Sequence, residues 1–147
     1  MCSVLLVALI LILSLVVALA VVASRRYTPC CPDSWVGYQQ KCYYFSETEG
    51  NWDSSRSQCS ALGASLAGID SLQELAFLMR HKGPEIPWIG LRREGEVQPW
   101  KWANGTEFNK LFNVMGGESC AYLNGGTVSS SRCPSEKKWI CSKLSLH

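Results

Sequence analysis

The chain lacks the groups that most enzymes and metal sites require. It has only two histidines, His81 and His147, and neither lies near a nucleophile and an orienting acid in a motif for covalent catalysis. No Cys-x-x-Cys pair with matching histidines is present, which argues against zinc as the reason for the clustered cysteines. We therefore expect a protein that is not an enzyme.

A strong net charge is also missing. The formal charge is +2, which Arg25 and Arg26 supply, and residues 31–147 carry twelve basic and twelve acidic side chains. A neutral domain without a basic run is a poor nucleic-acid binder, so no nucleic acid is expected as a partner. Residues 31–79 sum to −4 and residues 80–147 to +4, which indicates a basic face built from the C-terminal half.

The beginning of the chain is a long apolar run. Residues 4–23 are apolar except for Ser14, and at about 1.5 Å per residue they span roughly 30 Å, the thickness of a bilayer core. A cleaved signal peptide is the alternative, because Val21 and Ala23 suit the positions before a cut at Ser24. The run exceeds the usual length of a signal peptide's apolar region and no basic segment precedes it, which favours an uncleaved anchor.

Two signals disagree about orientation. Arg25 and Arg26 follow the apolar run, and the positive-inside rule would place that side in the cytosol. The cysteine density instead requires an oxidising compartment, and the acceptor sequence Asn104-Gly105-Thr106 is usable only in the lumen. Because large domains translocate largely regardless of such charges, we expect a single-pass type II protein of the plasma membrane, with the C-terminal domain outside and Asn104 glycosylated. The expected parts are a cytosolic stub (1–3), a signal-anchor (4–23), a short stalk (24–30) and one domain (31–147).

Within the domain the pattern predicts short strands, two helices and long loops. Asn51 can cap a helix that ends at Gly63. Ser71 and Glu74 form a capping-box pattern at the start of a second helix, which residues 83–84 stop. Strands are expected at residues 42–45, 88–91, 100–102, 120–123 and 138–141, and residues 103–119 are expected to be mostly loop.

Several motifs taken together resemble a C-type-lectin-like domain, and the resemblance covers residues 31–147. It implies an α+β fold with two helices, two small antiparallel sheets, long loops and three disulfides. Of the fifteen pairings that six cysteines allow, it selects Cys31 with Cys42, Cys59 with Cys141, and Cys120 with Cys133. The motifs are Trp88-Ile89-Gly90-Leu91, Trp139-Ile140-Cys141 and the spacing of the six cysteines.

Cys30 is left over by this pairing. An odd cysteine in a secreted domain points to an intermolecular bond or a free thiol. Because Cys30 directly precedes the domain, we expect it to link two copies into a homodimer about a two-fold axis. It could instead replace Cys31 as the partner of Cys42.

The resemblance also implies where a sugar-binding relative would hold calcium, and the residues there do not suit the ion. Calcium needs six to eight oxygen ligands, mostly carboxylates and amide carbonyls. The segment before Cys133 holds Val128, Ser129 and Ser130, and the loop before Cys120 contains no proline. Glu118 alone cannot hold the ion, so no cofactor and no metal are expected.

The closer resemblance is to the lectin-like transcript and early activation antigen subgroup on leukocytes. It implies a calcium-independent, disulfide-linked cell-surface ligand whose partner is a lectin-like receptor protein on natural killer cells or other leukocytes. Two alternatives are a calcium-independent glycan-binding lectin, and a secreted C-type-lectin-like protein if the apolar segment is cleaved. The residues that carry the resemblance are 31–37, 73–78, 99–102, 120–124 and 139–143.

The same subgroup implies a receptor-binding face after the fourth domain cysteine and before the last strand. Tyrosine and arginine most often supply binding energy at interfaces, so Tyr122 and Arg132 are the expected anchors. The lysines are expected to steer an acidic partner more than to hold it. An ordinary solvated charged edge is the alternative. The residues expected on this face are Tyr122, Asn124, Arg132, Glu136, Lys137 and Lys138.

Overall fold

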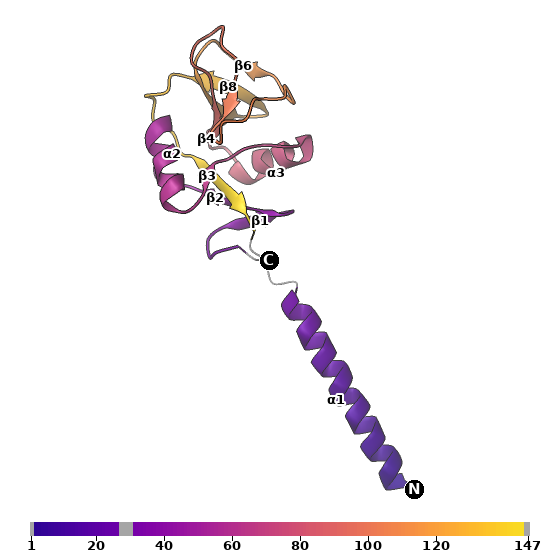
Figure 1. Cartoon of the computed structure of the whole chain (residues 1–147). Coiled ribbons are helices and arrows are strands. Elements are labelled where there is room, and N and C mark those ends of the chain that lie inside the picture. The colour runs from indigo at the N-terminus through magenta and orange to yellow at the C-terminus, as the bar shows by residue number, and fades with distance from the viewer. Residues whose placement is uncertain (1, 27–30, 146–147) are drawn as a thin grey trace. The chain divides into compact units, whose positions relative to one another are not determined.

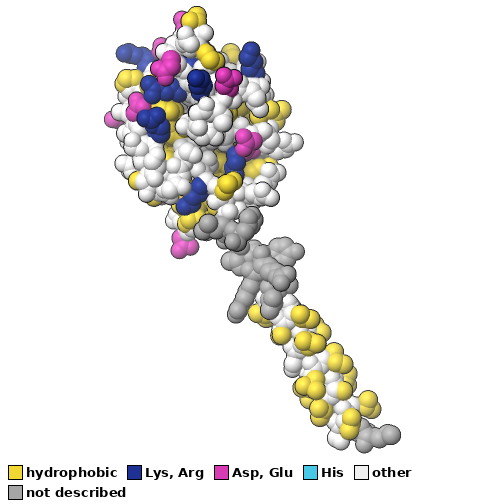
Figure 2. Space-filling view, viewed as in Figure 1, with side chains coloured by type: hydrophobic (Ala, Val, Ile, Leu, Met, Phe, Trp, Pro, Cys, Tyr) yellow, Lys and Arg dark blue, Asp and Glu magenta, His cyan; other side chains and the backbone are white. Residues whose placement is uncertain are grey.

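The N-terminal unit is a single helix. The computed structural model describes residues 2–26 and 31–145, and the chain separates into two units, 1–30 and 31–147. Helix α1 (Cys2–Arg26) contains a segment, Ser3–Val21, that is long and apolar enough to cross a membrane by length and composition, as a signal sequence also would be. The side chains from Ser3 to Val21 are all exposed (Figure 2), as in a helix without a protein core to pack against.

The first sheet of the C-terminal unit has the strand order β1-β2-β9-β3, and its pairs are all antiparallel. The last strand of the chain therefore lies between two strands from the first third of the domain (Figure 1). The expected strand at 138–141 begins later and runs further, because residues 138–139 instead contact the other sheet and the helix region. The strands are β1 (Val36–Tyr38), β2 (Lys41–Phe45), β3 (Ser65–Leu66) and β9 (Ile140–Leu144).

The second sheet has the order β5-β4-β7-β8-β6. Three of its pairs are antiparallel, but β6 and β8 are parallel, so the expectation of purely antiparallel sheets is wrong for this edge. The parallel pair arises because residues 103–113 carry the chain away before β6 forms within the expected loop. The strands are β4 (Trp88–Arg92), β5 (Lys101–Trp102), β6 (Val114–Met115), β7 (Cys120–Asn124) and β8 (Thr127–Ser131).

Both expected helices of the domain are present and begin at the expected caps. Helix α2 (Trp52–Ala61) starts where the Asn51 side chain accepts a hydrogen bond from the backbone of Ser54. Helix α3 (Leu72–Lys82) starts where Ser71 accepts from the backbone of Glu74, while the Glu74 carboxylate accepts from the backbone of Asp70. These side chains satisfy amides that the first turn leaves free. In Figure 1, α2 and α3 lie on either side of the strands of the first sheet.

The two sheets meet at a point of close backbone approach. Gly90 in β4 donates its amide to the carbonyl of Ala67 at 2.8 Å. A Cβ atom at position 90 would collide with the carbonyl of Leu66 in β3. Only glycine therefore allows the sheets to come this close, and the apolar side chains around them, including Leu91, Leu123 and Ile140, are fully buried.

Three disulfides hold the domain together, in the pairing that the resemblance implies. Cys31–Cys42 closes the β1–β2 hairpin, Cys59–Cys141 joins α2 to β9 across 82 residues, and Cys120–Cys133 joins β7 to the segment after β8. Cys59 and Cys141 are fully buried. A domain of this size with short strands gains much of its stability from such cross-links.

A buried carboxylate ties α3 to the first sheet. The Glu74 side chain accepts hydrogen bonds from the Tyr43 hydroxyl and from Lys41 Nζ, the latter at 2.8 Å, and Lys41 also pairs with Asp70 at 2.6 Å. Burial, the hydrogen bond to Glu74 and the negative charge nearby raise the pKa of Tyr43. Burial lowers the pKa of Lys41, but its bonds to Asp70 and Glu74 outweigh this and raise it overall. The buried charge of Glu74 is thus paired and hydrogen-bonded.

Candidate functional site

The positions that correspond to a lectin calcium site are used for packing and backbone hydrogen bonds. Val128 in β8 is buried in the core. The Ser130 hydroxyl donates to the carbonyl of Met115 at 2.9 Å and accepts from the amide of Glu118 at 3.0 Å. Within residues 2–26 and 31–145, no three His, Cys, Asp or Glu side chains lie close enough together to hold a metal ion. This donor set does not fit calcium, which requires several carboxylate or amide oxygens.

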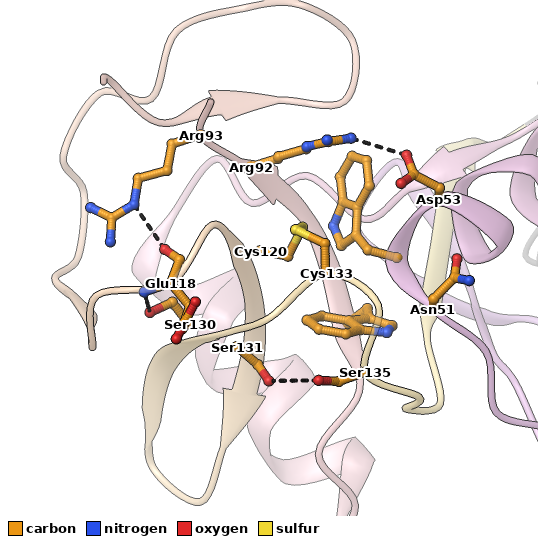
Figure 3. Close-up of a disulfide and its surroundings, with 12 residues drawn as sticks. Asn51, Asp53, Arg92, Arg93, Glu118, Cys120, Ser130, Ser131, Cys133 and Ser135 are labelled. Atoms are coloured by element: carbon orange, nitrogen blue, oxygen red, sulfur yellow. Dashed lines mark hydrogen bonds and ion pairs between the residues drawn. A yellow bond between two sulfur atoms is a disulfide. The ribbon is translucent and has the colours of Figure 1, made fainter. Parts of the chain in front are cut away.

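An arginine holds the same loops from the other side. Arg93 Nε donates to the carbonyl of Glu118 at 2.8 Å, and the two terminal nitrogens donate to the carbonyls of Glu96 and Gly116 at 3.2 and 3.4 Å. Its guanidinium lies 4.5 Å from the centre of the Trp100 ring. Figure 3 shows Arg93 reaching Glu118, whose amide is bonded to Ser130. A protein cation therefore contacts the carbonyls of loops that adjoin the expected metal position.

Sequence reasoning missed this role of Arg93. Nothing in the local pattern identifies it, because the carbonyls that it contacts lie 3 to 25 residues away along the chain. Ser130 was recognised only as a residue that cannot hold calcium. A hydroxyl and an arginine in the loops that lack carboxylates are the available signal, and it becomes interpretable only with the register of β7 and β8.

Tyr122, Asn124, Arg132, Glu136, Lys137 and Lys138 make up the expected receptor face, here called the Tyr122 face. The structure brings two of them into direct contact: Lys137 Nζ lies 4.1 Å from the centre of the Tyr122 ring. The same ammonium lies 5.5 Å from the Trp88 ring, and Trp88 packs edge-on against Tyr122 at 6.2 Å. Trp88 and Tyr122 are partners across β4 and β7. Trp88 is a fully buried support that the sequence did not assign to this face.

The two lysines of the Tyr122 face have different environments. The backbone of Lys137 pairs with Gly50 in both directions at 2.9 Å, and its side chain lies on the two rings. Burial lowers the pKa of Lys137, and the charge of Glu49 partly opposes this. Lys138 instead forms an ion pair with Glu85 at 3.0 Å. Lys137 is therefore a positioned, partly desolvated cation, whereas Lys138 has its own carboxylate.

The remaining members of the Tyr122 face lie along adjoining segments. Asn124 is exposed at the end of β7, next to the turn to β8, and Tyr122 is half-buried. Arg132 and Glu136 are exposed on the segment between β8 and β9, where the Arg132 carbonyl accepts from the amide of Ser135. The Cys120–Cys133 disulfide fixes this segment to the base of β7.

The glycosylation and dimer residues fall in different parts of the description. Asn104 is exposed in the turn after β5, where its side-chain oxygen accepts from the amide and hydroxyl of Thr106 at 3.0 and 2.6 Å. Its exposure would allow a glycan to be attached. Cys30, the expected interchain cysteine, lies outside the described residues, as does His147. His81 lies at the end of α3, where it packs on Phe45 at 4.6 Å.

Comparison with known proteins gives relatives that share this domain. The family described as Lectin C-type domain matches residues 48–143. C-type lectin domain family 2 member D of Homo sapiens is 53% identical over 117 residues, which cover 80% of this chain and 61% of that protein. Early activation antigen CD69 of Homo sapiens is 45% identical over 120 residues, which cover 82% of this chain and 60% of that protein. The chain thus spans about three fifths of the length of these relatives.

Solved structures agree with the fold. The carbohydrate-recognition domain of the mouse scavenger receptor C-type lectin matches with a TM-score of 0.72 and 27% sequence identity, over 80% of this chain and 98% of that one. The match confirms the α+β arrangement of two helices and two small sheets in the domain.

Proposed function

Because the chain belongs to the Lectin C-type domain family, a non-enzymatic family in which it is related to C-type lectin domain family 2 members and CD69, we propose that it is a calcium-independent cell-surface ligand. Its partner in this proposal is a lectin-like receptor protein of natural killer cells or other leukocytes. The protein would be a type II membrane protein with α1 as its anchor. A Cys30–Cys30 bond would join two copies.

The observation that carries the proposal is the contact of Lys137 with Tyr122 and Trp88. Interface anchors are typically aromatic or cationic side chains that are held in place before the partner arrives. Tyr122 is half-buried on a fully buried tryptophan, so its ring loses little freedom on binding. The loops nearby are held by Arg93 and Ser130, which supports binding without calcium.

A receptor panel tests the proposal. The full chain in lipid nanodiscs is passed over immobilised natural-killer lectin-like receptors, with calcium and with EDTA. We expect one receptor to bind equally in both, and Tyr122→Ala or Arg132→Ala to weaken binding by about 2 kcal/mol, or roughly thirtyfold. Arg80→Ala on exposed α3 is the matched control and should bind like the wild type. Wild-type affinity in both folded anchor variants would reject the Tyr122 face, and chelator-reversible stabilisation by calcium would reject calcium independence.

Orientation and assembly have separate readouts. A type II chain retains its apolar segment and carries glycan on Asn104, so glycosidase treatment should increase mobility and Asn104→Gln should abolish that change. An N-terminus at Ser24 would show a secreted protein instead. Non-reducing electrophoresis should give a dimer that Cys30→Ser converts to a folded monomer. An unfolded Cys30→Ser protein would contradict the interchain assignment.

A further inference from the structure

A cleft of about 210 Å³ opens between α2, the end of β4 and β5, away from the Tyr122 face in residue content. Four cationic side chains line it, from three different elements, against one carboxylate, Glu94. Two indole side chains, Trp52 and Trp102, also line it. We call it the basic cleft, and its cations are Arg56, Arg92, Arg93 and Lys101.

The sheet register forces two of these cations together. Arg92 and Lys101 are direct partners on the antiparallel strands β4 and β5, and both line the basic cleft. Like charges that lie directly opposite in this way destabilise a strand pair. The only carboxylate bonded to them is Asp53, whose oxygen lies 3.0 Å from Arg92 and 3.8 Å from Arg56 (Figure 3). One half-exposed carboxylate thus serves two arginines, and Lys101 has no ion-pair partner among the described residues.

Hydrogen-bond donors remain available at this position. The contact of Arg56 with Asp53 is too long for a hydrogen bond, so the Arg56 fork is free to bind an oxyanion in two places. Arg92 uses one terminal nitrogen on Asp53, and its Nε has no acceptor among the residues that the structure describes. Arg93 differs, because its donors are directed to backbone carbonyls.

The aromatic residues hold these cations in place. The guanidinium groups of Arg92 and Arg56 lie 5.2 and 5.5 Å from the centre of the Trp52 ring, on a side chain that is 2% exposed. Trp102 is half-buried and offers an apolar surface at the side of the basic cleft. Cations positioned beside an indole match a ring that has an apolar C–H face and anionic substituents.

We propose that the basic cleft binds an acidic glycan, with sulfate or carboxylate groups of one or two sugar rings on Arg56, Arg92 and Lys101 and a ring face on Trp102. The volume is below the about 300–1,000 Å³ of drug-sized sites, which favours one or two rings. A long polyanion such as nucleic acid would need a wider field than a domain with twelve basic and twelve acidic residues supplies. The site shares no residue with the Tyr122 face, so it stands or falls separately from receptor binding.

The test uses the full chain in neutral lipid nanodiscs with EDTA and a fluorescent heparin-derived tetrasaccharide. The Arg56→Gln, Lys101→Gln variant removes two exposed cations from the basic cleft. Its matched control, Arg80→Gln with Lys110→Gln, removes two exposed cations elsewhere and leaves the same net charge. We expect the cleft variant to lose at least about tenfold in affinity, as two charge-assisted hydrogen bonds imply, and the control to change by less than about twofold. Circular dichroism and receptor binding should be unchanged in both.

Each other outcome has a defined reading. Loss of binding after chemical desulfation of the tetrasaccharide supports a sulfate contact, and retention supports the uronic acid carboxylate. Absence of tetrasaccharide binding overturns the proposal. Equal loss in the cleft variant and the control also overturns it, because binding would then follow net charge alone. A polyglutamate peptide that binds as tightly and competes for the same site would assign the basic cleft to acidic peptides and overturn the glycan assignment.

Discussion

Arg93 Nε donates a 2.8 Å hydrogen bond to the backbone carbonyl of Glu118, two residues before the start of β7. The same guanidinium bonds to the carbonyls of Glu96 and Gly116, so one side chain joins the loop after β4 to the loop before β7. Calcium in a sugar-binding relative would be coordinated in this region by oxygen atoms. Here a fixed cation satisfies backbone oxygens instead, which makes the loop arrangement independent of metal concentration.

Replacing Arg93 with alanine should loosen these loops. We expect a loss of about 2 kcal/mol in unfolding free energy, since three charge-assisted bonds to carbonyls disappear. Hydrogen exchange should accelerate at residues 94–100 and 115–119, and added calcium should not restore protection because the carboxylates that it needs are absent. Arg80→Ala, on exposed α3, is the control. Unchanged exchange in those two segments would contradict a bracing role.

The Tyr43–Glu74 bond predicts a loss of stability at alkaline pH. The pKa of Tyr43 is raised above its ordinary 10.0, so above about pH 10 the unfolded chain releases the phenol proton while the folded chain retains it. Stability therefore falls as pH rises. The raised pKa of Lys41 acts in the same direction, because its contribution is present below 10.5 and is lost as pH passes the folded value. The lowered pKa of Lys137 acts oppositely below 10.5.

Tyr43→Phe measures the tyrosine contribution. We expect a cost of about 1.5–3 kcal/mol near neutral pH, because a buried hydrogen bond to a carboxylate is lost. The decline in urea midpoint between about pH 9 and 11 should also become shallower than in the wild type. Tyr44→Phe is the control, as Tyr44 contacts Trp35 and no carboxylate among the described residues. Parallel pH profiles for Tyr43→Phe and wild type would show that the phenol does not contribute.

The Cys59–Cys141 bond should be worth more than the Cys31–Cys42 bond. It closes a separation of 82 residues rather than 11, and the chain-entropy model then gives about 4.5 kcal/mol against about 3. Paired alanine substitutions, compared by urea unfolding, measure the difference. Because Cys59 and Cys141 are also fully buried, their removal adds a cavity cost to the same side. Equal losses for the two pairs would contradict this ranking.

Local signals in the sequence predicted the helix starts and the central strands well. Asn51 and Ser71 cap the helices as expected, because capping depends on residues within one turn. The short strands β1, β3, β6 and β8 were not predicted. Two- and three-residue strands carry too little alternation to detect, and serine-rich β8 lacks the usual apolar pattern, so its pairing depends on β7 and on the turn at residues 125–126.

The candidate site was predictable in membership more than in energetics. The subgroup resemblance placed Tyr122 and Lys137 on one face, but treated both lysines as steering charges. Trp88 below Tyr122 comes from a strand 34 positions earlier, and no short-range pattern joins Lys137 to either ring. The basic cleft was foreseen only as a charge excess in the C-terminal half. Arg56 of α2 joins it through tertiary packing.

The contact between Lys137 and Tyr122 should be measurable without knowledge of a receptor. A cation within 4.1 Å of a ring centre and partly removed from water is worth about 0.5–2 kcal/mol. A double-mutant cycle with Lys137→Met and Tyr122→Leu, followed by urea unfolding, should therefore give a coupling of that size. Lys138→Met with Tyr122→Leu is the matched cycle and should give a coupling near zero, since Lys138 pairs with Glu85 instead.

The same geometry predicts how the two lysines affect receptor binding. A charge that is already positioned and desolvated contributes after encounter, so Lys137→Met should mainly raise the dissociation rate. Lys138→Met should mainly lower the association rate and reduce its salt dependence, because an exposed rim charge acts by steering. Surface plasmon resonance at two salt concentrations separates these effects for any receptor found in the panel. If Lys137→Met changes only the association rate, the ammonium is a steering charge like its neighbour, and its position on the two rings serves the fold alone.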